Sequence, residues 1–187
     1  FGQPSENAER LGTLVEVKKR QAVSGVDINL EQAWKTYGNG NHDTIVAMID
    51  TGIDYTHEDL KDTLWVNTDE IPGNGIDDDG NGYVDDVYGW NFYNNNNQIF
   101  TGEEDSHGTH GAGTISAGTG NGIGIAGIVP GNRVRVMALK ALGGTDGGGS
   151  TAAVIKAIRY AEDNGAVICN LSLTSTVDDK ALYEAMK

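Results

Sequence analysis

The amino-acid sequence predicts an α/β fold in which helices cover both faces of a doubly wound, mostly parallel sheet. Residues 44–50 (TIVAMID) form an apolar run rich in β-branched residues, as a strand buried on both faces does. Residues 133–140 (RVRVMALK) indicate a second strand. Residues 150–163 (STAAVIKAIRYAED) follow with apolar residues at helical spacing. Strands that alternate with helices are typical of a parallel sheet.

The predicted elements alternate in type along the chain. In order they are a helix over 29–37, a strand over 44–50, an irregular segment over 66–106, a helix over 107–118, a strand over 133–140, a helix over 150–163, a buried strand over 166–173 and a helix from about Asp178. Ser150 is suited to cap the helix that follows it, and Asn164-Gly165 to end that helix. Cys169, the only cysteine, lies in the apolar run AVICNL, which predicts a small core residue.

Residues 1–27 are interpreted as a lead-in segment or the remnant of an upstream region, and residues 28–187 as the domain.

The composition limits the kinds of partner. Lysine and arginine number 13 against 27 aspartates and glutamates, a formal charge of −14. Nucleic acids and anionic membranes bind basic surfaces, so we expect neither as a partner. No run of about 18 apolar residues predicts a membrane span.

Two residues are candidates for catalysis. Asp50 ends the first predicted strand, and functional groups gather at the carboxyl ends of parallel strands. His107 begins a helix of small residues, where a carboxylate could hold its Nδ1–H while Nε2 faces a substrate. Taken alone, such a histidine is more often a capping or core residue. The spacing of His107 and His110 also fits a metal site, but the glutamate of the zinc-protease motif and a third ligand are lacking.

Several stretches together resemble the subtilisin-like serine proteases. AMIDTGID (47–54) resembles the aspartate signature of that family, and HGTH (107–110) with AGT (112–114) its histidine signature. AGIVP (126–130) and NLSL (170–173) resemble two further stretches, and all follow the order of the family, with Asp before His. The resemblance covers about residues 28 to 175. It implies that residues 28–187 are the N-terminal part of a subtilisin-like catalytic domain, an incomplete copy of the fold.

The resemblance implies a Ser-His-Asp mechanism. Asp50 would orient His107, and His107 would be the general base toward a serine. An extended peptide would lie as an added strand between two backbone edges, formed by Gly147, Gly148 and Gly149 and by Ser172 and Leu173. A plain flexible loop is the alternative for the glycine run. The family usually continues its Ser-Leu with Gly-Gly, whereas the Thr174-Ser175 side chains would crowd this groove.

The nucleophilic serine is absent from the sequence. In the family it stands in a Gly-Thr-Ser-Met-Ala-like motif well beyond the histidine. None of the seven serines (5, 24, 106, 116, 150, 172 and 175) stands in such a motif, and the asparagine that donates to the oxyanion is missing too. We therefore expect this chain alone to be inactive. Its expected partners are a peptide or protein substrate and the C-terminal part of the catalytic domain.

Residues 75–86 (GIDDDGNGYVDD) form an acidic loop that suits Ca²⁺. Asp77, Asp79 and Asn81 alternate like the first three ligands of an EF-hand loop, although the loop is not an EF-hand. The predicted ligands are three side chains, one carbonyl and a closing carboxylate, namely Asp77, Asp79, Asn81, the Tyr83 carbonyl and Asp86 or a neighbour. A solvated acidic loop without an ion is the alternative.

The family resemblance implies a second Ca²⁺ site. Asp59 and Asn121 match side chains that bind the ion in many subtilisins. The carbonyl oxygens of Ile123 and Ile125 would contribute as well.

The expected protein is the N-terminal portion of a calcium-stabilised serine endopeptidase that is secreted or held at the cell envelope. The first residues lack the apolar core of a signal peptide, so a secreted protein would be present here in processed form. Two alternatives stay open: a non-catalytic relative that serves as a scaffold, and a calcium-binding interaction module. The module would not need Asp50 and His107 to be neighbours in space.

Overall fold

A computed structural model describes residues 27–38, 40, 43–131 and 133–187. The chain divides into two units, residues 1–36 and 37–187. Helix α1 (Leu30–Tyr37) confirms the helix predicted over 29–37, and Glu31 pairs with Lys35 across one turn at 3.9 Å. The predicted lead-in over 1–27 lies outside the described residues except for Asp27.

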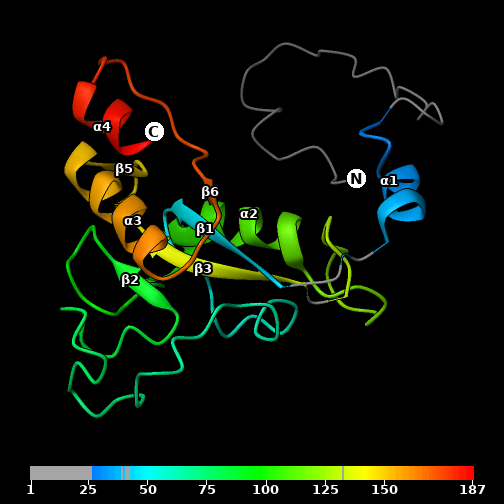
Figure 1. Cartoon of the computed structure of the whole chain (residues 1–187), viewed down its shortest axis with the longest axis horizontal. Coiled ribbons are helices and arrows are strands. Elements are labelled where there is room, and N and C mark those ends of the chain that lie inside the picture. The colour runs from blue at the N-terminus through cyan, green and yellow to red at the C-terminus, as the bar shows by residue number, and fades with distance from the viewer. Residues whose placement is uncertain (1–26, 39, 41–42, 132) are drawn as a thin grey trace, which may run out of the picture. The chain divides into compact units, whose positions relative to one another are not determined.

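The second unit contains a four-stranded parallel sheet (Figure 1). Its order is β2 (Gly89–Asn91), β3 (Val134–Lys140), β1 (Thr44–Asp50) and β6 (Ile168–Asn170). β1 and β3 pair over their whole length, from Thr44 opposite Val134 to Asp50 opposite Lys140. Because both strands end at the same edge, the residues that follow them are brought together there.

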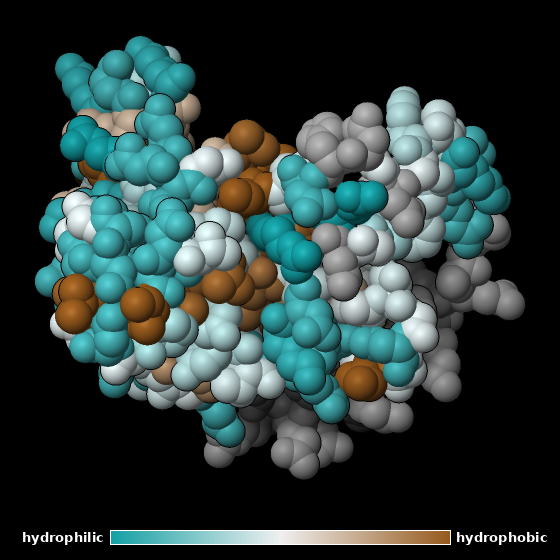
Figure 2. Space-filling model, turned by 60° about the horizontal axis from the view of Figure 1, so that its bottom comes forward, coloured by the Kyte–Doolittle hydropathy of each residue, from teal (hydrophilic) through white to brown (hydrophobic). Residues whose placement is uncertain are grey.

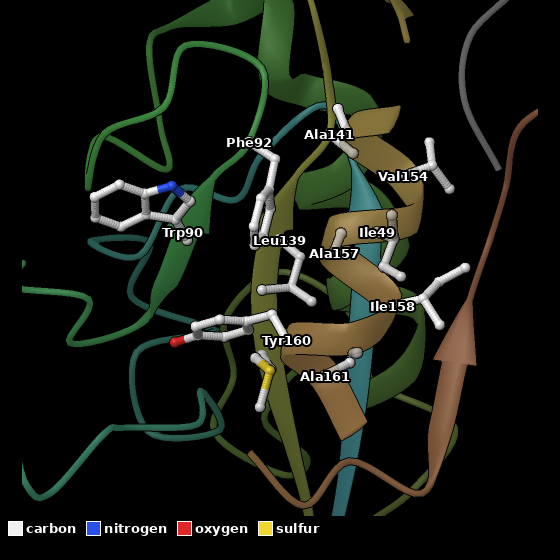
Figure 3. Close-up of a cluster of buried hydrophobic side chains, with 13 residues drawn as sticks. Ile49, Trp90, Phe92, Leu139, Ala141, Val154, Ala157, Ile158, Tyr160 and Ala161 are labelled. Atoms are coloured by element: carbon white, nitrogen blue, oxygen red, sulfur yellow. The ribbon is translucent and has the colours of Figure 1, made fainter. Parts of the chain in front are cut away.

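Helices cover both faces of this sheet, which confirms the doubly wound prediction. Residues of β1 alternate between the faces. Ala47 and Ile49 pack with α3 (Thr151–Asp163), while Val46 and Met48 pack on the side of α2 (Ser106–Ser116). Figure 3 shows Ile49 among the residues of α3. α4 (Lys180–Ala185) adds Leu182 and Ala185 to the edge of the α3 core.

The remaining elements are short. A 3₁₀ turn, η2 (Glu103–Asp105), leads into α2, and β4 (Leu142–Gly143) pairs antiparallel with β5 (Gly148–Gly149). The predicted cap is confirmed, since the Ser150 side chain accepts a hydrogen bond from Ala153 N at 3.1 Å. The segment predicted to be irregular, 66–106, is mostly so, but it also contributes β2 and η2.

The third strand differs from its prediction. β6 covers three residues rather than 166–173, and neither it nor the residue before it is buried: Val167 is 74% exposed, Ile168 52%, and Cys169 is exposed as well. β6 lies at the edge of the described sheet beside β1 alone, so one side of it has no neighbour to bury it. On the face drawn in Figure 2 the surface is largely hydrophilic, with hydrophobic residues in a few patches. Within the described residues, no helix combines the length and apolarity needed to cross a membrane.

Candidate active site

Asp50 and His107, 57 positions apart, lie in hydrogen-bonding contact. Asp50 is the last residue of β1, and His107 stands in the first turn of α2. The distance from His107 Nδ1 to Asp50 Oδ1 is 2.7 Å. Since a carboxylate only accepts, Nδ1 carries the proton, and in the neutral ring Nε2 keeps its lone pair. The strand end and the helix start thus bring together the two residues that the sequence proposed.

Burial differs sharply between the two partners. The Asp50 side chain is fully buried, whereas that of His107 is 61% exposed. Asp50 Oδ1 also accepts from Thr51 N at 2.7 Å, and Asp50 Oδ2 accepts no hydrogen bond among the described groups. A buried carboxylate with so few hydrogen-bond donors around it is stabilised by an imidazole that donates to it. The arrangement therefore suits an aspartate that orients a histidine.

His107 opens onto a cleft of about 770 Å³. Both predicted backbone edges line it, namely Gly147, Gly148 and Gly149, and Ser172 and Leu173. The glycine run is not a plain loop, because Gly148 and Gly149 pair with Gly143 and Leu142. Thr174 and Ser175 line the cleft as well, where the sequence placed them. The structure thus gathers the candidate base and both candidate substrate edges around one space.

The acidic loop is folded around its own carboxylates. Asp77 accepts hydrogen bonds from the backbone N–H groups of Asn81 and Gly82, and these bonds, that of Gly82 first, lower the pKa of the Asp77 carboxyl. Asp79 accepts from Asn81 N at 3.0 Å. Oxygens of Asp77, Asp79 and Glu70 lie within 4.8 Å of one another. The sequence interpretation missed Glu70, because a carboxylate ahead of the loop follows no ligand-spacing rule.

Asp86 and Tyr83 lie on the core side of this loop. Asp86 is fully buried and accepts from Asn67 Nδ2, Asn81 Nδ2 and the Tyr160 hydroxyl. The Tyr83 ring packs against Tyr160 with centroids 5.0 Å apart. Asp86 therefore anchors the loop to α3. Instead of Asp86, the predicted closing carboxylate, Glu70 is the third carboxylate that lies with Asp77 and Asp79.

The residues predicted for the second cation site also lie together. Asp59 is buried, and its Oδ1 accepts from Asn121 Nδ2 at 2.7 Å. Its Oδ2 accepts from Ile125 N at 3.1 Å, and Asn121 Oδ1 accepts from Ile123 N at 3.1 Å. The loop of Asn121, Ile123 and Ile125 is thus closed around the Asp59 carboxylate.

Comparison with known proteins agrees with this geometry. The model of the subtilase family matches residues 41–186. Subtilisin-like protease 1 of Plasmodium berghei is 43% identical over 97 residues, which are 51% of this chain and 16% of that protein. The halolysin-like extracellular serine protease Nep of Natrialba magadii is 33% identical over 154 residues, 82% of this chain and 24% of the relative. The major intracellular serine protease of Bacillus subtilis is 36% identical over 142 residues, 76% and 37% of the respective lengths.

The chain thus spans well under half the length of these relatives. The family match itself covers most of the chain, including the Asp50 and His107 signatures and both edges of the cleft. The chain belongs to the subtilase family.

Proposed function

We propose that this chain is the N-terminal portion of the catalytic domain of a serine endopeptidase, which hydrolyses peptide bonds. Asp50 orients His107, and His107 is the general base. The observation that carries the proposal is the 2.7 Å contact between His107 Nδ1 and Asp50 Oδ1 beside a cleft with two backbone edges.

In the proposed reaction, a serine Oγ bonds to the substrate carbonyl carbon while its proton passes to His107 Nε2. Asp50 keeps the Nδ1–H in place and stabilises the imidazolium. The proton then passes to the leaving amine nitrogen as the C–N bond breaks, and water attacks the acyl-enzyme by the same route. Since none of the seven serines stands in a nucleophile motif, we assign the nucleophile to another segment of the whole protein.

The substrate is a peptide or protein segment in extended form. Gly148 and Gly149 offer backbone without side chains, and Ser172-Leu173 offers a second edge that lines the same cleft. Such edges bind a peptide through main-chain hydrogen bonds, as an added strand does. The exposed edge strand β6 favours a further partner, the remaining part of the catalytic domain, which would cover Val167 and Ile168.

The contact between Asp50 and His107 disfavours the alternative of a pure calcium-binding module, since such a module does not need it. A non-catalytic scaffold would share this geometry, so the activity experiment below distinguishes it from the enzyme.

Ca²⁺ is the proposed structural ion, and the first site consists of Glu70, Asp77, Asp79 and Asn81 with the Tyr83 carbonyl. The donors are all oxygen, as Ca²⁺ prefers, and three carboxylates converge. The lowered pKa keeps Asp77 ionised, which suits a cation. The ion would offset the repulsion between these charges and stiffen the loop.

A second proposed Ca²⁺ site consists of Asp59, Asn121 and the carbonyls of Ile123 and Ile125. The support is the closure of this loop on one buried carboxylate. We further propose that the protein works outside the cell or at its envelope, for which the support is the charge of −14. The relatives include one protease named extracellular and one named intracellular, so secretion is tested by fractionating the producing cells.

The test is a casein or fluorogenic-peptide digest with the whole protein and with its His107→Ala and Asp50→Asn variants. In subtilisin, the relative for which these losses are known, removing the histidine costs on the order of 10⁶ in kcat and removing the aspartate about 10⁴. We expect losses of that order here. His110→Gln, an exposed histidine on the same helix, is the control and should keep its activity. A wild-type protein without turnover would support the scaffold alternative instead.

A further inference from the structure

Lys140 is a buried cation beside the candidate active site. It ends β3 directly opposite Asp50 in the sheet, and its side chain is 1% exposed. Its Nζ donates to the Thr51 carbonyl oxygen and to Asp105 Oδ1. Lysine is almost never fully buried unless it is paired, so this placement needs an explanation.

Asp105, the partner of Lys140, is held at both carboxylate oxygens. It is fully buried at the start of α2, two residues before His107. While Oδ1 faces Lys140, Oδ2 accepts from Thr101 N at 2.6 Å and from Thr101 Oγ1 at 2.9 Å. Its backbone carbonyl accepts from Thr109 Oγ1 at 3.0 Å, within the same helix. The first turn of α2 is thus tied to a fixed carboxylate.

One ammonium group therefore joins the two segments that carry the candidate dyad. Thr51 follows Asp50 directly, and Asp105 stands two residues before His107. A shift of either segment would stretch a bond to Lys140 Nζ. A buried ion pair is often no more stabilising than two well-packed apolar residues, so stability alone does not account for the pair.

We propose that Lys140 and Asp105 are positioning residues that hold His107 Nδ1 against Asp50. They act through the backbone at Thr51 and the start of α2, and neither contacts the substrate. The inference deepens the proposed function and rests on it for its meaning, but the contact that it concerns is observed independently of proteolysis. A purely structural pair would contribute to the melting temperature without selectively affecting that contact.

The experiment measures the Nδ1–H proton resonance of His107 by NMR in the 187-residue chain labelled with ¹⁵N-histidine. An imidazole held by a carboxylate protects this proton from exchange, and His107→Ala assigns the signal. The variants are Lys140→Met, which leaves the Asp105 charge unpaired, and Lys140→Met with Asp105→Leu, which replaces the pair by apolar residues. Val136→Ala, a fully buried residue on the same strand, is the matched control for lost stability.

Lys140→Met should lower the melting temperature by about 10 °C and remove the signal, since breaking a buried pair is costly. The double variant should recover most of the melting temperature but not the signal. Val136→Ala should melt at a lower temperature than the wild type and keep the His107 Nδ1–H signal. A double variant that keeps the signal overturns the proposal, and so does loss of the signal in Val136→Ala.

Thr101 supplies a milder test should the double variant fail to fold. Thr101 is exposed, and Thr101→Val removes only its hydroxyl, which lies at 2.9 Å from both Asp105 Oδ2 and Glu104 Oε1. We expect faster exchange of the His107 Nδ1–H in Thr101→Val and unchanged exchange in Thr101→Ser. Equal exchange rates in the two variants would contradict the positioning role. The readout is a proton signal rather than turnover. A negative result for the positioning role can therefore be told apart from a failure of the proposed protease function.

Discussion

Gly108 lies so close to the backbone of Gly52 that it has no room for a side chain. A Cβ at Gly108 would come within 2.2 Å of the Gly52 carbonyl oxygen and 3.2 Å of Asp50 Oδ1. Gly52 itself has φ +124°, which few other residues adopt, and a Cβ there would meet the Ile99 carbonyl at 2.4 Å. In addition, Gly108 N donates to Thr51 Oγ1 at 3.1 Å. The turn after Asp50 thus contacts the helix that carries His107 through the backbone of Gly52 and Gly108 and through the Thr51 hydroxyl.

Gly108→Ala is therefore expected to push α2 away from this turn. Overpacking of a close contact costs about 1–3 kcal/mol in unfolding free energy, and the His107–Asp50 distance should lengthen. Gly113→Ala is the matched control on the same helix, because its Cβ would meet only Ile125 Cδ1, at 3.6 Å. That variant should be neutral or stabilise by up to about 1 kcal/mol. Denaturant unfolding of both variants is the measurement, and equal midpoints would contradict the close-contact argument.

The candidate dyad could be predicted because each of its residues stands at the end of a regular element. The strand TIVAMID is apolar throughout, so its extent, and with it the position of Asp50, followed from the sequence. The start of α2 fell within one residue of its prediction. That the glycine run and Ser172-Leu173 line the same cleft could be predicted only from the family resemblance. No local sequence pattern relates these two stretches.

Long-range contacts account for what could not be predicted. Lys140 ends an apolar strand, and its partner Asp105 lies 35 positions away in a segment without periodicity. Glu70 joins the acidic loop through three-dimensional folding, not through spacing. The exposure of β6 depends on the absence of a second neighbouring strand in the described sheet, which the apolar run AVICNL does not reveal.

Ca²⁺ is expected to raise the melting temperature of the chain. An ion that binds the folded state alone adds about 2.7 kcal/mol at a hundredfold excess over its dissociation constant. At about 2–4 °C per kcal/mol for a chain of this size, one such site corresponds to a shift of roughly 5–10 °C. Thermal unfolding with Ca²⁺ and with a chelator measures it.

Asp77→Ala and Glu70→Gln should each reduce this calcium effect, and any remainder should depend on Asp59. Asp178→Asn, an exposed carboxylate outside both loops, is the control and should leave the effect unchanged. A midpoint that does not respond to Ca²⁺, or an Asp77→Ala variant with the full response, would refute the assignment of the acidic loop.

Tyr160 links the acidic loop to α3, and its replacement should destabilise the protein in a pH-dependent way. Figure 3 shows Tyr160 among the core residues that α3 contributes, and its hydroxyl donates to Asp86. Tyr160→Phe should cost about 1.5–3 kcal/mol at neutral pH, since the bond goes to a charged acceptor. Tyr183→Phe, an exposed tyrosine on α4, is the control and should change little.

The same variant should change the alkaline limb of the stability curve. Burial first, and then the bond to Asp86, raises the pKa of Tyr160 above its ordinary value of 10.0. The folded state therefore keeps this proton more tightly than the unfolded chain does. Its stabilisation is complete below pH 10.0 and is lost as the pH rises above that value. Tyr160→Phe should make this loss shallower, and an unchanged slope between pH 9 and 11 would contradict the argument.

The 187-residue chain alone is expected to hydrolyse no peptide bond above background. Within the described residues, no hydrogen bond joins His107 to a serine hydroxyl. The serines along the cleft are engaged elsewhere: Ser150 Oγ accepts from Ala153 N, and Ser172 Oγ accepts from Asn170 Nδ2 at 2.9 Å. Without a nucleophile His107 has no hydroxyl to deprotonate, and in subtilisin loss of the serine alone costs about as much as loss of the whole triad.

The measurement is a casein or fluorogenic-peptide digest with the purified chain, with and without a serine-directed covalent inhibitor. The whole protein, assayed in parallel, is the positive control. A separate C-terminal segment that carries a Gly-Thr-Ser motif should restore turnover when it is added, because its serine would enter the cleft beside His107. Inhibitor-sensitive turnover by the chain alone would identify one of its seven serines as a nucleophile, and the assignment of that role to another segment would then be wrong.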